Sequence, residues 1–438
     1  MFRLRRLLRP RNLLRMVIGV STTLMLALVF VVLFEPGLTY HVSAPVPSTR
    51  SPVLLDLLGS AVEQAPLAVD DATVYPEGAQ FYPAELALIR SATTSIDLEA
   101  FIFHATPVGQ RFVDALVERA RAGVKVRIVV DAVGSMPTPD KFFDTLRAAG
   151  AQVAWYQPFR WYTLKRWNNR THRELLVVDG HTAFIGGAGI GAAWDTGTNA
   201  SPPWRDLMVR VTGTPARGLQ AVFAQSWLES HGEILVGPEM TPEHSTLPAV
   251  VGIYTPVAMV VGSTPTGGRS TRARVLFQIL VGAARQELRI TSPYFVPDQS
   301  MRSALLEAVA RGVRVTIMTN GAHNNHTIAR LASRRWYGEL IAGGVQIHEY
   351  QPGMLHAKIM LVDGLWSVVG STNFDNRSFG LNNEVNLVLR DATIASALDR
   401  TVASYLNKSR RMTLADWENR SIGERALATL GSVLERQE

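Results

Sequence analysis

The chain has no cysteine, and this absence excludes several kinds of protein. Disulfide scaffolds, thiolate zinc sites and cysteine nucleophiles all require thiols. A lack of free thiols also suits an oxidising compartment. Charged residues are sparse as well, at 18% of 438 residues, whereas 47% are hydrophobic. This composition is typical of a globular protein rather than a disordered one.

The excess of basic over acidic residues is almost entirely confined to the N-terminus. The net charge is +7, with 44 lysines and arginines against 37 acidic residues. Six of the arginines fall within the first 15 residues, where there is no acid, so the rest of the chain is close to neutral. A protein that binds nucleic acid needs a basic face on its folded body. We therefore expect no nucleic-acid partner.

A long uncharged stretch follows these arginines. Residues 16–34 contain no charged side chain, and a helix rising about 1.5 Å per residue would carry them across a hydrocarbon core of roughly 30 Å. The sequence predicts a basic flank at 1–15, a transmembrane anchor at 16–35 and a proline-containing linker at 36–70. A cleaved signal peptide is the alternative, although its apolar stretch is normally about 7–15 residues. The positive-inside rule places the N-terminus in the cytoplasm and the body outside.

The body of the chain repeats itself. Three blocks of the first half match three blocks of the second in the same order and without gaps: 115–131 with 304–320, 150–158 with 344–352, and 171–180 with 355–364. In the first pair, an amphipathic helix pattern ends at a glycine and a β-branched strand pattern follows. This order predicts a duplicated α/β fold, with one domain at 71–240, a second at 241–408 and a helical tail at 409–438.

The third block carries the candidate chemistry. In its second copy, His356 and Lys358 are two residues apart, so their side chains are expected on one face of a strand. A phosphoryl group needs such a pair, because a nitrogen can attack phosphorus or move a proton while a fixed cation binds the non-bridging oxygens. Asp363 closes the block, and Ser371 and Asn373 follow as candidate phosphate-binding residues.

The first copy repeats this frame with His172 and Asp179. A lone histidine before a strand is more often structural, but two at matching positions of a repeat indicate a shared catalytic site. A catalytic histidine needs a partner that fixes its tautomer. We expect Glu384 to hold His356 and Asp206 to hold His172.

The His-x-Lys-x4-Asp frame, followed by a Gly-Ser-x-Asn step, resembles the signature of the phospholipase D superfamily. The stretches SPYFVPD (292–298) and RLASRRWY (330–337) are more similar to its bacterial cardiolipin synthase branch than to its nucleases. The resemblance implies two tandem α-β-α domains related by pseudo-two-fold symmetry, with one active site at their junction. It also implies a phosphohistidine formed on His172, with His356 as general acid and base, and no metal or cofactor.

The substrates implied by the resemblance are a phosphatidylglycerol-like phospholipid and an alcohol acceptor, at a bacterial cell membrane that the chain crosses once. It favours a phosphatidyltransferase similar to cardiolipin synthase. A hydrolase that uses water as the acceptor is one alternative, because both reactions share the intermediate. A non-catalytic lipid-binding protein with a decayed site is another. The oligomeric state is left open.

Two departures from the family pattern fall in the first copy. Glu174 stands where the pattern has lysine, and Gly189 stands where it has asparagine. A carboxylate facing the phosphate would weaken catalysis. A neutral or hydroxyl-binding Glu174, a weakened or dead site, and a compensating cation are the alternatives, and the candidate cations are Arg173, Lys165, Arg166 and Arg170. The inserted basic and aromatic loop, 159–171, is a further candidate for binding lipid head groups.

Overall fold

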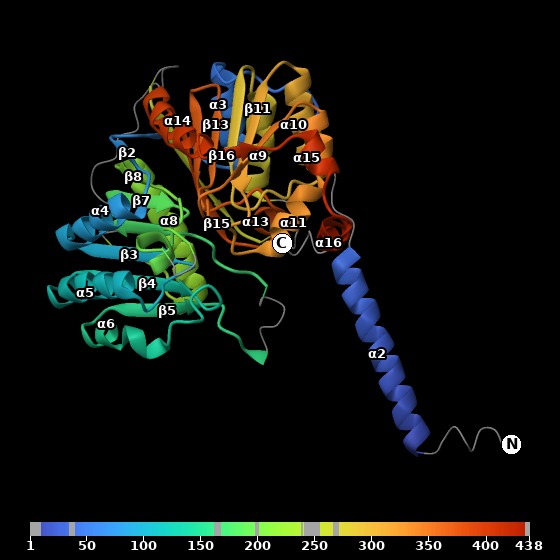
Figure 1. Ribbon diagram of the computed structural model, residues 1–438. Coiled ribbons are helices and arrows are strands. Elements are labelled where there is room, and N and C mark those ends of the chain that lie inside the picture. Colours follow the sequence, from blue (N-terminus) through green and yellow to red (C-terminus); the bar gives the residue numbers. More distant parts are fainter. Residues whose placement is uncertain are drawn as a thin grey trace.

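The structure, a computed structural model, describes residues 10–34, 40–161, 168–197, 201–237, 240, 255–265 and 271–433. These residues form two α/β units that lie against each other, and one further helix extends away from both (Figure 1). Each unit is built on one mixed sheet. The predicted α/β fold with two sheets is therefore confirmed.

The first unit contains a seven-stranded sheet. Its strands lie in the order β2 (Ala72–Tyr75), β8 (Met208–Thr212), β7 (Thr182–Gly186), β6 (Leu175–Val178), β3 (Ser95–Ala100), β4 (Lys125–Asp131) and β5 (Gln152–Tyr156). Strands β3, β4 and β5 run parallel, and the other neighbours are antiparallel. The helices on its outer face are α4 (Gly78–Ser91), α5 (Pro107–Arg121), η1 (Asp140–Phe143), α6 (Asp144–Ala148) and α7 (Ala192–Asp195).

The second unit contains a nine-stranded sheet. Its strands lie in the order β1 (Leu67–Ala68), β9 (Val257–Ser263), β15 (Glu384–Arg390), β14 (Trp366–Gly370), β13 (Ile359–Val362), β10 (Glu287–Thr291), β11 (Arg314–Asn320), β12 (Gln346–Tyr350) and β16 (Ser409–Arg411). The helices that pack on its outer core are α3 (Pro52–Val62), α9 (Arg272–Ala283), α10 (Gln299–Ala310) and α12 (Tyr337–Ala342). Shorter or peripheral helices complete the unit: α11 (Thr327–Arg335), α13 (Asn376–Gly380), α15 (Leu414–Glu418) and α16 (Ile422–Val433).

A shared core joins the inner faces of the two sheets. Helices α8 (Thr214–His231) and α14 (Ala392–Leu406) bury apolar side chains in one cluster with strands of both sheets. Phe223 and Trp227 come from α8, and Leu398 and Val402 come from α14. Burial of apolar surface is the main force that holds such layers together. The two units are therefore packed through a continuous core rather than tethered by chain alone.

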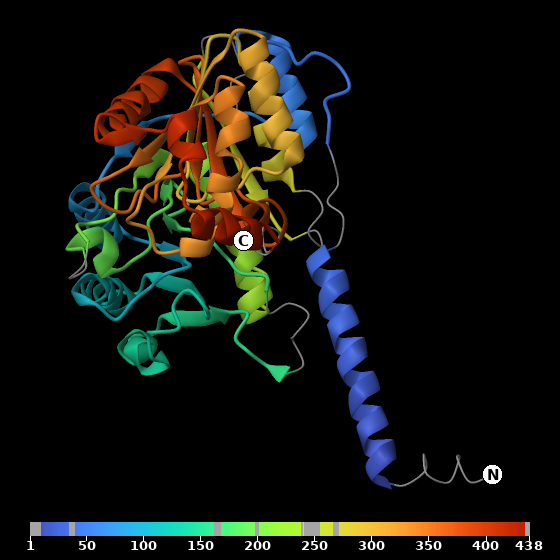
Figure 2. The ribbon, with the colours of Figure 1, turned by 45° about the vertical axis from the view of Figure 1, so that its right-hand side comes forward.

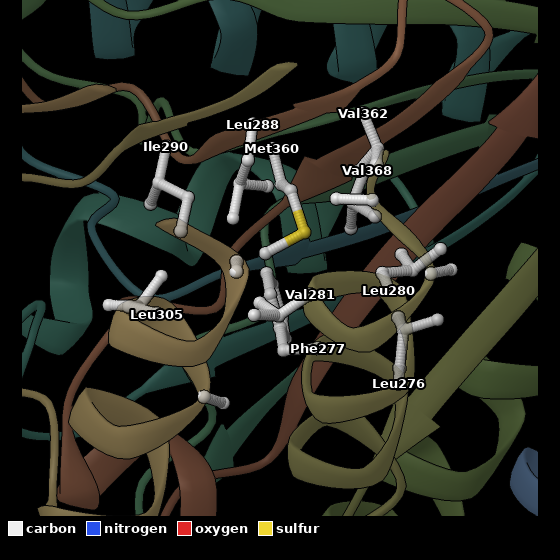
Figure 3. Close-up of a cluster of buried hydrophobic side chains, with 14 of the residues drawn as sticks. Leu276, Phe277, Leu280, Val281, Leu288, Ile290, Leu305, Met360, Val362 and Val368 are labelled. Carbon is white, nitrogen blue, oxygen red and sulfur yellow. The ribbon is translucent and has the colours of Figure 1, made fainter. Parts of the chain in front are cut away.

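The outer core of the second unit follows directly from the sequence pattern. Leu276, Phe277, Leu280 and Val281 recur at helical spacing along α9 and point at the sheet (Figure 3). Side chains of β10, β13 and β14 meet them there. Both predicted glycine stops are also present, since Gly123 and Gly312 follow α5 and α10 with φ of 90° and 89°, a backbone region that favours glycine.

The predicted linker at 36–70 is wrong for much of its length. Residues 35–39 lie outside the described part of the chain, but 52–62 form α3 and 67–68 form β1 of the second sheet. Leu54, Leu58 and Val62 are fully buried in the second unit. Apolar residues recur every three to four positions in this stretch, which indicates a helix. Its prolines favour a linker instead, but one of them, Pro52, starts the helix. The chain thus packs on the second unit before it enters the first.

The boundary of the predicted C-terminal tail also needs correction. Residues 409–411 form β16, which extends the second sheet by pairing with β12. The helices of the tail, α15 and α16, follow it. A three-residue edge strand carries too short a pattern to be identified from sequence.

The N-terminal stretch forms one helix, α2 (Pro10–Phe34), which extends away from both units in two views (Figures 1 and 2). Residues 1–9 of the predicted basic flank lie outside the described residues. Among the residues that the structure describes, no helix is both long and apolar enough to cross a membrane. The predicted transmembrane anchor therefore has no support from them.

Candidate active site

The two histidines lie where the two units meet. His172 precedes β6 and His356 precedes β13, at matching places in the two sheets. The backbone N–H of His172 donates to the carbonyl of Asn383 at 2.9 Å, and that of His356 donates to the carbonyl of Arg205 at 2.6 Å. Each histidine segment is therefore hydrogen-bonded to a segment of the opposite unit.

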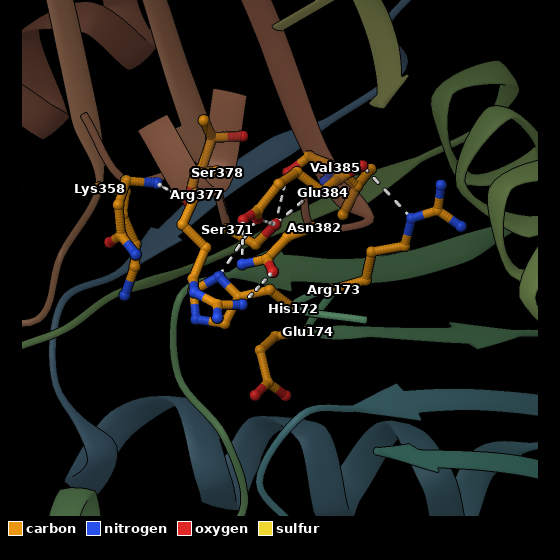
Figure 4. A network of polar contacts seen from close by, with 12 residues as sticks. His172, Arg173, Glu174, Lys358, Ser371, Arg377, Ser378, Asn382, Glu384 and Val385 are labelled. Atoms are coloured by element: carbon orange, nitrogen blue, oxygen red, sulfur yellow. Dashed lines mark hydrogen bonds and ion pairs between the residues drawn. The ribbon is translucent and has the colours of Figure 1, made fainter. Parts of the chain in front are cut away.

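His172 is held by a carboxylate of the second unit. Its Nδ1 lies 3.2 Å from Oε2 of Glu384, which is fully buried at the start of β15 (Figure 4). Ser371 donates its hydroxyl to the same oxygen at 2.5 Å, and the amide of Asn382 donates to the other oxygen at 3.3 Å. The expected pairing of Glu384 with His356 is therefore wrong. Ser371, predicted to bind phosphate, uses its hydroxyl on this carboxylate instead.

His356 is held by a carboxylate of the first unit. Its Nδ1 lies 2.7 Å from Oδ2 of Asp206, so the expected pairing of Asp206 with His172 is also wrong. The indole of Trp194 and the backbone N–H of Leu207 donate to Asp206 at 3.2 and 2.9 Å. The exchange has a simple cause. The segment that ends at Asp206 crosses to the second unit, where Arg205 forms a β-bridge with Leu355.

Lys358 supplies a buried cation beside His356. Its Nζ lies 2.7 Å from Nδ1 and 3.1 Å from Nε2 of the ring, as expected for side chains two residues apart in an extended segment. Burial lowers the pKa of Lys358 to about 8. Burial, and then the charge of Lys358, lower the pKa of His356 to about 4. Burial alone would raise the pKa of Asp206, but Lys358 and His356 together hold it below its usual value. At neutral pH this corner combines an ammonium, a carboxylate and a neutral imidazole.

The side chain of Glu174 points away from His172 although the two residues are close in sequence (Figure 4). Its carboxyl is buried and points away from the His172–Glu384 network (Figure 4), and it accepts a hydrogen bond from the N–H of Ile102 at 3.3 Å. Burial raises its pKa well above the usual value, which favours the neutral acid. A Cβ at Gly189 would lie 3.0 Å from the Glu174 carboxyl. Glu174 and Gly189, the two departures from the family pattern, are therefore neighbours, and the Glu174 carboxyl fills the space that a side chain at position 189 would take.

The candidate compensating cations are engaged elsewhere. The guanidinium of Arg173 bonds to groups on the far side of the strand, among them the carbonyl of Glu384 at 3.3 Å. Arg170 donates to the carbonyl of Gln157 at 2.8 Å and lies 3.5 Å from Asp131. Lys165 and Arg166 lie outside the described residues. Of the alternatives, the structure favours a neutral Glu174 over compensation by Arg173 or Arg170.

Asp179 and Asp363 have a structural part rather than a catalytic one. Both adopt φ of 52° in the turns that follow β6 and β13, at the ends remote from the histidines. Asp179 accepts hydrogen bonds from the backbone N–H groups of residues 93–95. Asp363 does the same for residues 285–287. Each aspartate therefore ties a turn to the start of the neighbouring strand.

Asn373 is the predicted phosphate-binding residue that retains free capacity. It is buried, and its side-chain oxygen has no hydrogen-bond partner within the described part of the chain. A buried polar atom without a partner is unusual and often marks a ligand position. An amide oxygen accepts hydrogen bonds, so this atom suits a hydroxyl donor such as an alcohol and not a phosphate oxygen. Asn373 can contact a phosphate only through its amide N–H, whereas Lys358 is placed to do so as a cation.

Sequence reasoning missed two features of the site. Asp375 is buried near His172 and Glu384, and burial raises its pKa to about 6. Aromatic rings surround His356, with the centroids of Trp194 and Trp204 both 5.4 Å from it. The repeat and the spacing of its motifs assign no role to Asp375, Trp194 or Trp204. The described residues contain no group of three or more His, Cys, Asp or Glu side chains placed to hold a metal ion.

Comparison with known proteins agrees with this arrangement. Residues 86–197 and 278–406 match the family described as cardiolipin synthase, PLD-like domain. The chain is 30% identical over 355 residues to the probable cardiolipin synthase YwiE of Bacillus subtilis, covering 80% of this chain and 69% of that protein. It is 33% identical over 353 residues to cardiolipin synthase A of Pseudomonas putida, covering 80% and 71%.

Solved structures share the fold. Phosphatidylserine synthase of Haemophilus influenzae superposes with a TM-score of 0.67 at 12% identity, over 88% of this chain and all of that one. Polyphosphate kinase of Porphyromonas gingivalis superposes with a TM-score of 0.54 at 11% identity, over 89% and 56%. At these identities the likeness concerns the fold alone.

The fold and the site define an enzyme in which two copies of one α/β unit each contribute a histidine to a single junction. Its similarity to the cardiolipin synthases identifies it as an enzyme of the phosphatidyltransferase and phospholipase D type. The chain belongs to the phospholipase D superfamily, in its cardiolipin synthase-like branch.

Proposed function

We propose that this protein is a phosphatidyltransferase that moves a phosphatidyl group from a phosphatidylglycerol-like lipid to an alcohol acceptor. The observation that carries the proposal is the pair of His–carboxylate contacts across the junction, with Lys358 beside one of them. Relatives named as cardiolipin synthases support the choice of substrate class.

In the first step, Nε2 of His172 attacks phosphorus, and the bond from phosphorus to the leaving alkoxide breaks. Glu384 holds Nδ1, so that the lone pair is on Nε2. His356 gives a proton to the alkoxide. Burial and Lys358 lower its pKa to about 4, so His356 must take up this proton together with the substrate. An anionic phosphodiester beside Lys358 would raise the pKa of His356 by offsetting the ammonium charge. Lys358 and the amide N–H of Asn373 bind the non-bridging oxygens.

In the second step, the acceptor alcohol gives its proton to His356 and its oxygen attacks the phosphohistidine. The bond between phosphorus and His172 breaks, and both histidines return to their starting states. Water in place of the alcohol would give hydrolysis by the same route. Asp206 stabilises the protonated form of His356 in both directions, because its carboxylate contacts Nδ1.

The test is to supply phosphatidylglycerol, with and without excess glycerol, and to identify the lipid products. Cardiolipin supports transfer, and phosphatidic acid as the sole product supports a hydrolase. Turnover should be lost in His172→Ala and His356→Ala but kept in His181→Ala, since His181 is exposed in the turn before β7. Absence of turnover in the unaltered protein, with lipid binding unaffected by the two active-site substitutions, would support a lipid-binding protein instead.

We also propose that the enzyme works at a bacterial membrane, with the N-terminal residues 1–35 lying at it and both units on its outer side. The uncharged run and the arginines before it support this topology. Protease added to intact spheroplasts should cleave the α/β units if the topology is right. Protection of the units until lysis would contradict it.

A further inference from the structure

Arg173 lies between His172 and Glu174 in sequence, but its side chain enters the interface between the two units. It is completely buried. Its guanidinium makes five hydrogen bonds: Nε to the carbonyl of Glu384 (3.3 Å), Nη1 to the carbonyl of Val222 (3.2 Å) and the hydroxyl of Ser226 (2.8 Å), and Nη2 to the amide oxygen of Gln225 (3.1 Å) and the carbonyl of Ser263 (3.2 Å). One side chain thus bonds α8 of the first unit and strands β9 and β15 of the second.

These bonds act on the residue that holds His172. The backbone N–H of His172 donates to the carbonyl of Asn383, and the side chain of Arg173 donates to the carbonyl of Glu384. Two consecutive residues of the first unit are thus hydrogen-bonded to two consecutive residues of the second. Figure 4 shows the arginine reaching the start of β15, on the opposite side of that strand from the imidazole. The carbonyl of Glu384 is fixed by Arg173 while its carboxylate contacts Nδ1 of His172.

The other half of the site lacks this arginine. The position that matches Arg173 in the repeat is Ala357, which is fully buried. The His356–Asp206 contact is nevertheless the shorter of the two, because Trp194 and the backbone of Leu207 also bind Asp206. Burying a guanidinium is costly unless its donors are satisfied. A role confined to packing would not require a charged group whose planar fork contacts three separate elements.

We propose that Arg173 is a positioning residue, which fixes Glu384 against His172 and thereby holds the His172 ring with its proton on Nδ1 and its lone pair on Nε2. The consequence for catalysis rests on the proposed function. The effect on the ring itself does not, and can be measured without substrate.

The test compares Arg173→Lys with a matched control, Arg127→Lys. Lysine keeps the charge but cannot reproduce the fork. Arg127 is 5% exposed and lies on β4 of the first sheet, where its Nε donates to Asp97 on β3 at 2.6 Å. We expect Arg173→Lys to lower kcat by about 10²-fold, since a displacement near 1 Å can have that effect, with little change in KM. Both substitutions should lower the melting temperature by similar amounts, but Arg127→Lys should not cause this loss of kcat.

NMR of the protein labelled with 15N-histidine provides the second measurement, with His172 assigned from a His172→Gln sample. Unaltered protein should show one fixed neutral tautomer at His172, and Arg173→Lys should show a mixture. An unchanged tautomer together with an unchanged kcat, or a loss of kcat equal to that of Arg127→Lys, would overturn the proposal. If the unaltered protein turns over no phosphodiester, the proposed function fails, whereas the NMR comparison still decides the positioning role.

A milder variant guards against failure of Arg173→Lys to fold. Ser226→Ala removes one acceptor of the arginine, at 2.8 Å, and leaves the guanidinium in place. It should shift both measurements in the same direction by a smaller amount. Ser226→Ala protein with the kcat and the His172 tautomer of the unaltered enzyme would contradict the proposal.

Discussion

His172 and His356 occupy equivalent places in a duplicated fold, yet their surroundings differ in charge and in support. His356 lies among Asp206, Lys358 and tryptophan rings, with its side chain 7% exposed. His172 is 12% exposed, and among the described residues its charged partner at close range is Glu384, while Glu174 stands at the position of a cation and points away from it (Figure 4). The two copies therefore place their histidines equivalently, but the charged groups around the two histidines differ.

This difference indicates a division of labour. The second copy contributes the cation and a histidine with a depressed pKa, which suit proton transfer and phosphate binding. The first copy contributes a histidine with no ammonium beside it in the part of the chain that the structure describes, and under the proposed function this suits an attacking nitrogen. Because each ring is held by a carboxylate of the other unit, neither unit alone contains a complete His–carboxylate pair.

The largest expected effects come from separating each histidine from its carboxylate. Glu384→Gln and Asp206→Asn should each lower kcat by about 10⁴-fold, because an amide favours the wrong tautomer. Single-turnover measurements should assign the losses differently. Glu384→Gln should slow formation of the phosphoenzyme, and Asp206→Asn should slow its transfer to the acceptor as well. Equal effects on formation alone would argue against the division of labour.

A smaller effect should follow from pH. Burial lowers the pKa of Lys358 to about 8, so the ammonium is present below that pH and is lost as the pH rises through it. We expect kcat/KM to decline above about pH 8. Lys358→Arg should abolish this decline, even if it lowers activity, because arginine stays charged. A decline that persists in Lys358→Arg would assign it to another group.

Substitution of Glu174 should have a modest effect if the acid is neutral. Glu174→Gln should leave kcat nearly unchanged, since an amide resembles the protonated carboxyl and retains an acceptor for Ile102. Glu174→Lys should instead destabilise the protein by about 3–5 kcal/mol, because it buries a charge without a partner. Urea unfolding and kcat distinguish these outcomes. Higher activity in Glu174→Lys would show that the site lacks a cation there.

The smallest effect on catalysis is expected at Asp179, the aspartate that ends the motif of the first copy. Asp179→Ala should leave kcat unchanged and lower the free energy of unfolding by about 1–3 kcal/mol, through loss of charge-assisted hydrogen bonds. Partial burial would raise the pKa of Asp179, but the N–H groups of residues 93–95 lower it overall. Its contribution is therefore present above the unfolded pKa and is lost as the pH falls through the folded pKa. A loss of kcat would restore a catalytic role.

The outcome for individual residues shows how far sequence reasoning reached. Repetition identifies His172 and His356, and Lys358 follows from its place two residues after His356. The order of helix and strand patterns identifies the units that carry them. Proximity along the chain predicts the wrong carboxylate partner for each of the two rings. Asp206 is nearer to His172 along the chain, but it lies beside His356. The linker was misjudged because its helix is stabilised by a surface that belongs to residues more than 200 positions away.

By itself, the sequence determined the duplication, the repeated helix and strand patterns of the two copies, and the two candidate catalytic histidines, because local periodicity and repetition encode these features. Only the tertiary structure decided which carboxylate meets which ring, and that Glu174 is a buried acid beside Gly189 rather than a charge facing phosphate. It also decided that Arg173 reaches across the junction. The physical reason is that these contacts depend on how two separately encoded sheets pack, and no spacing within either copy specifies that arrangement.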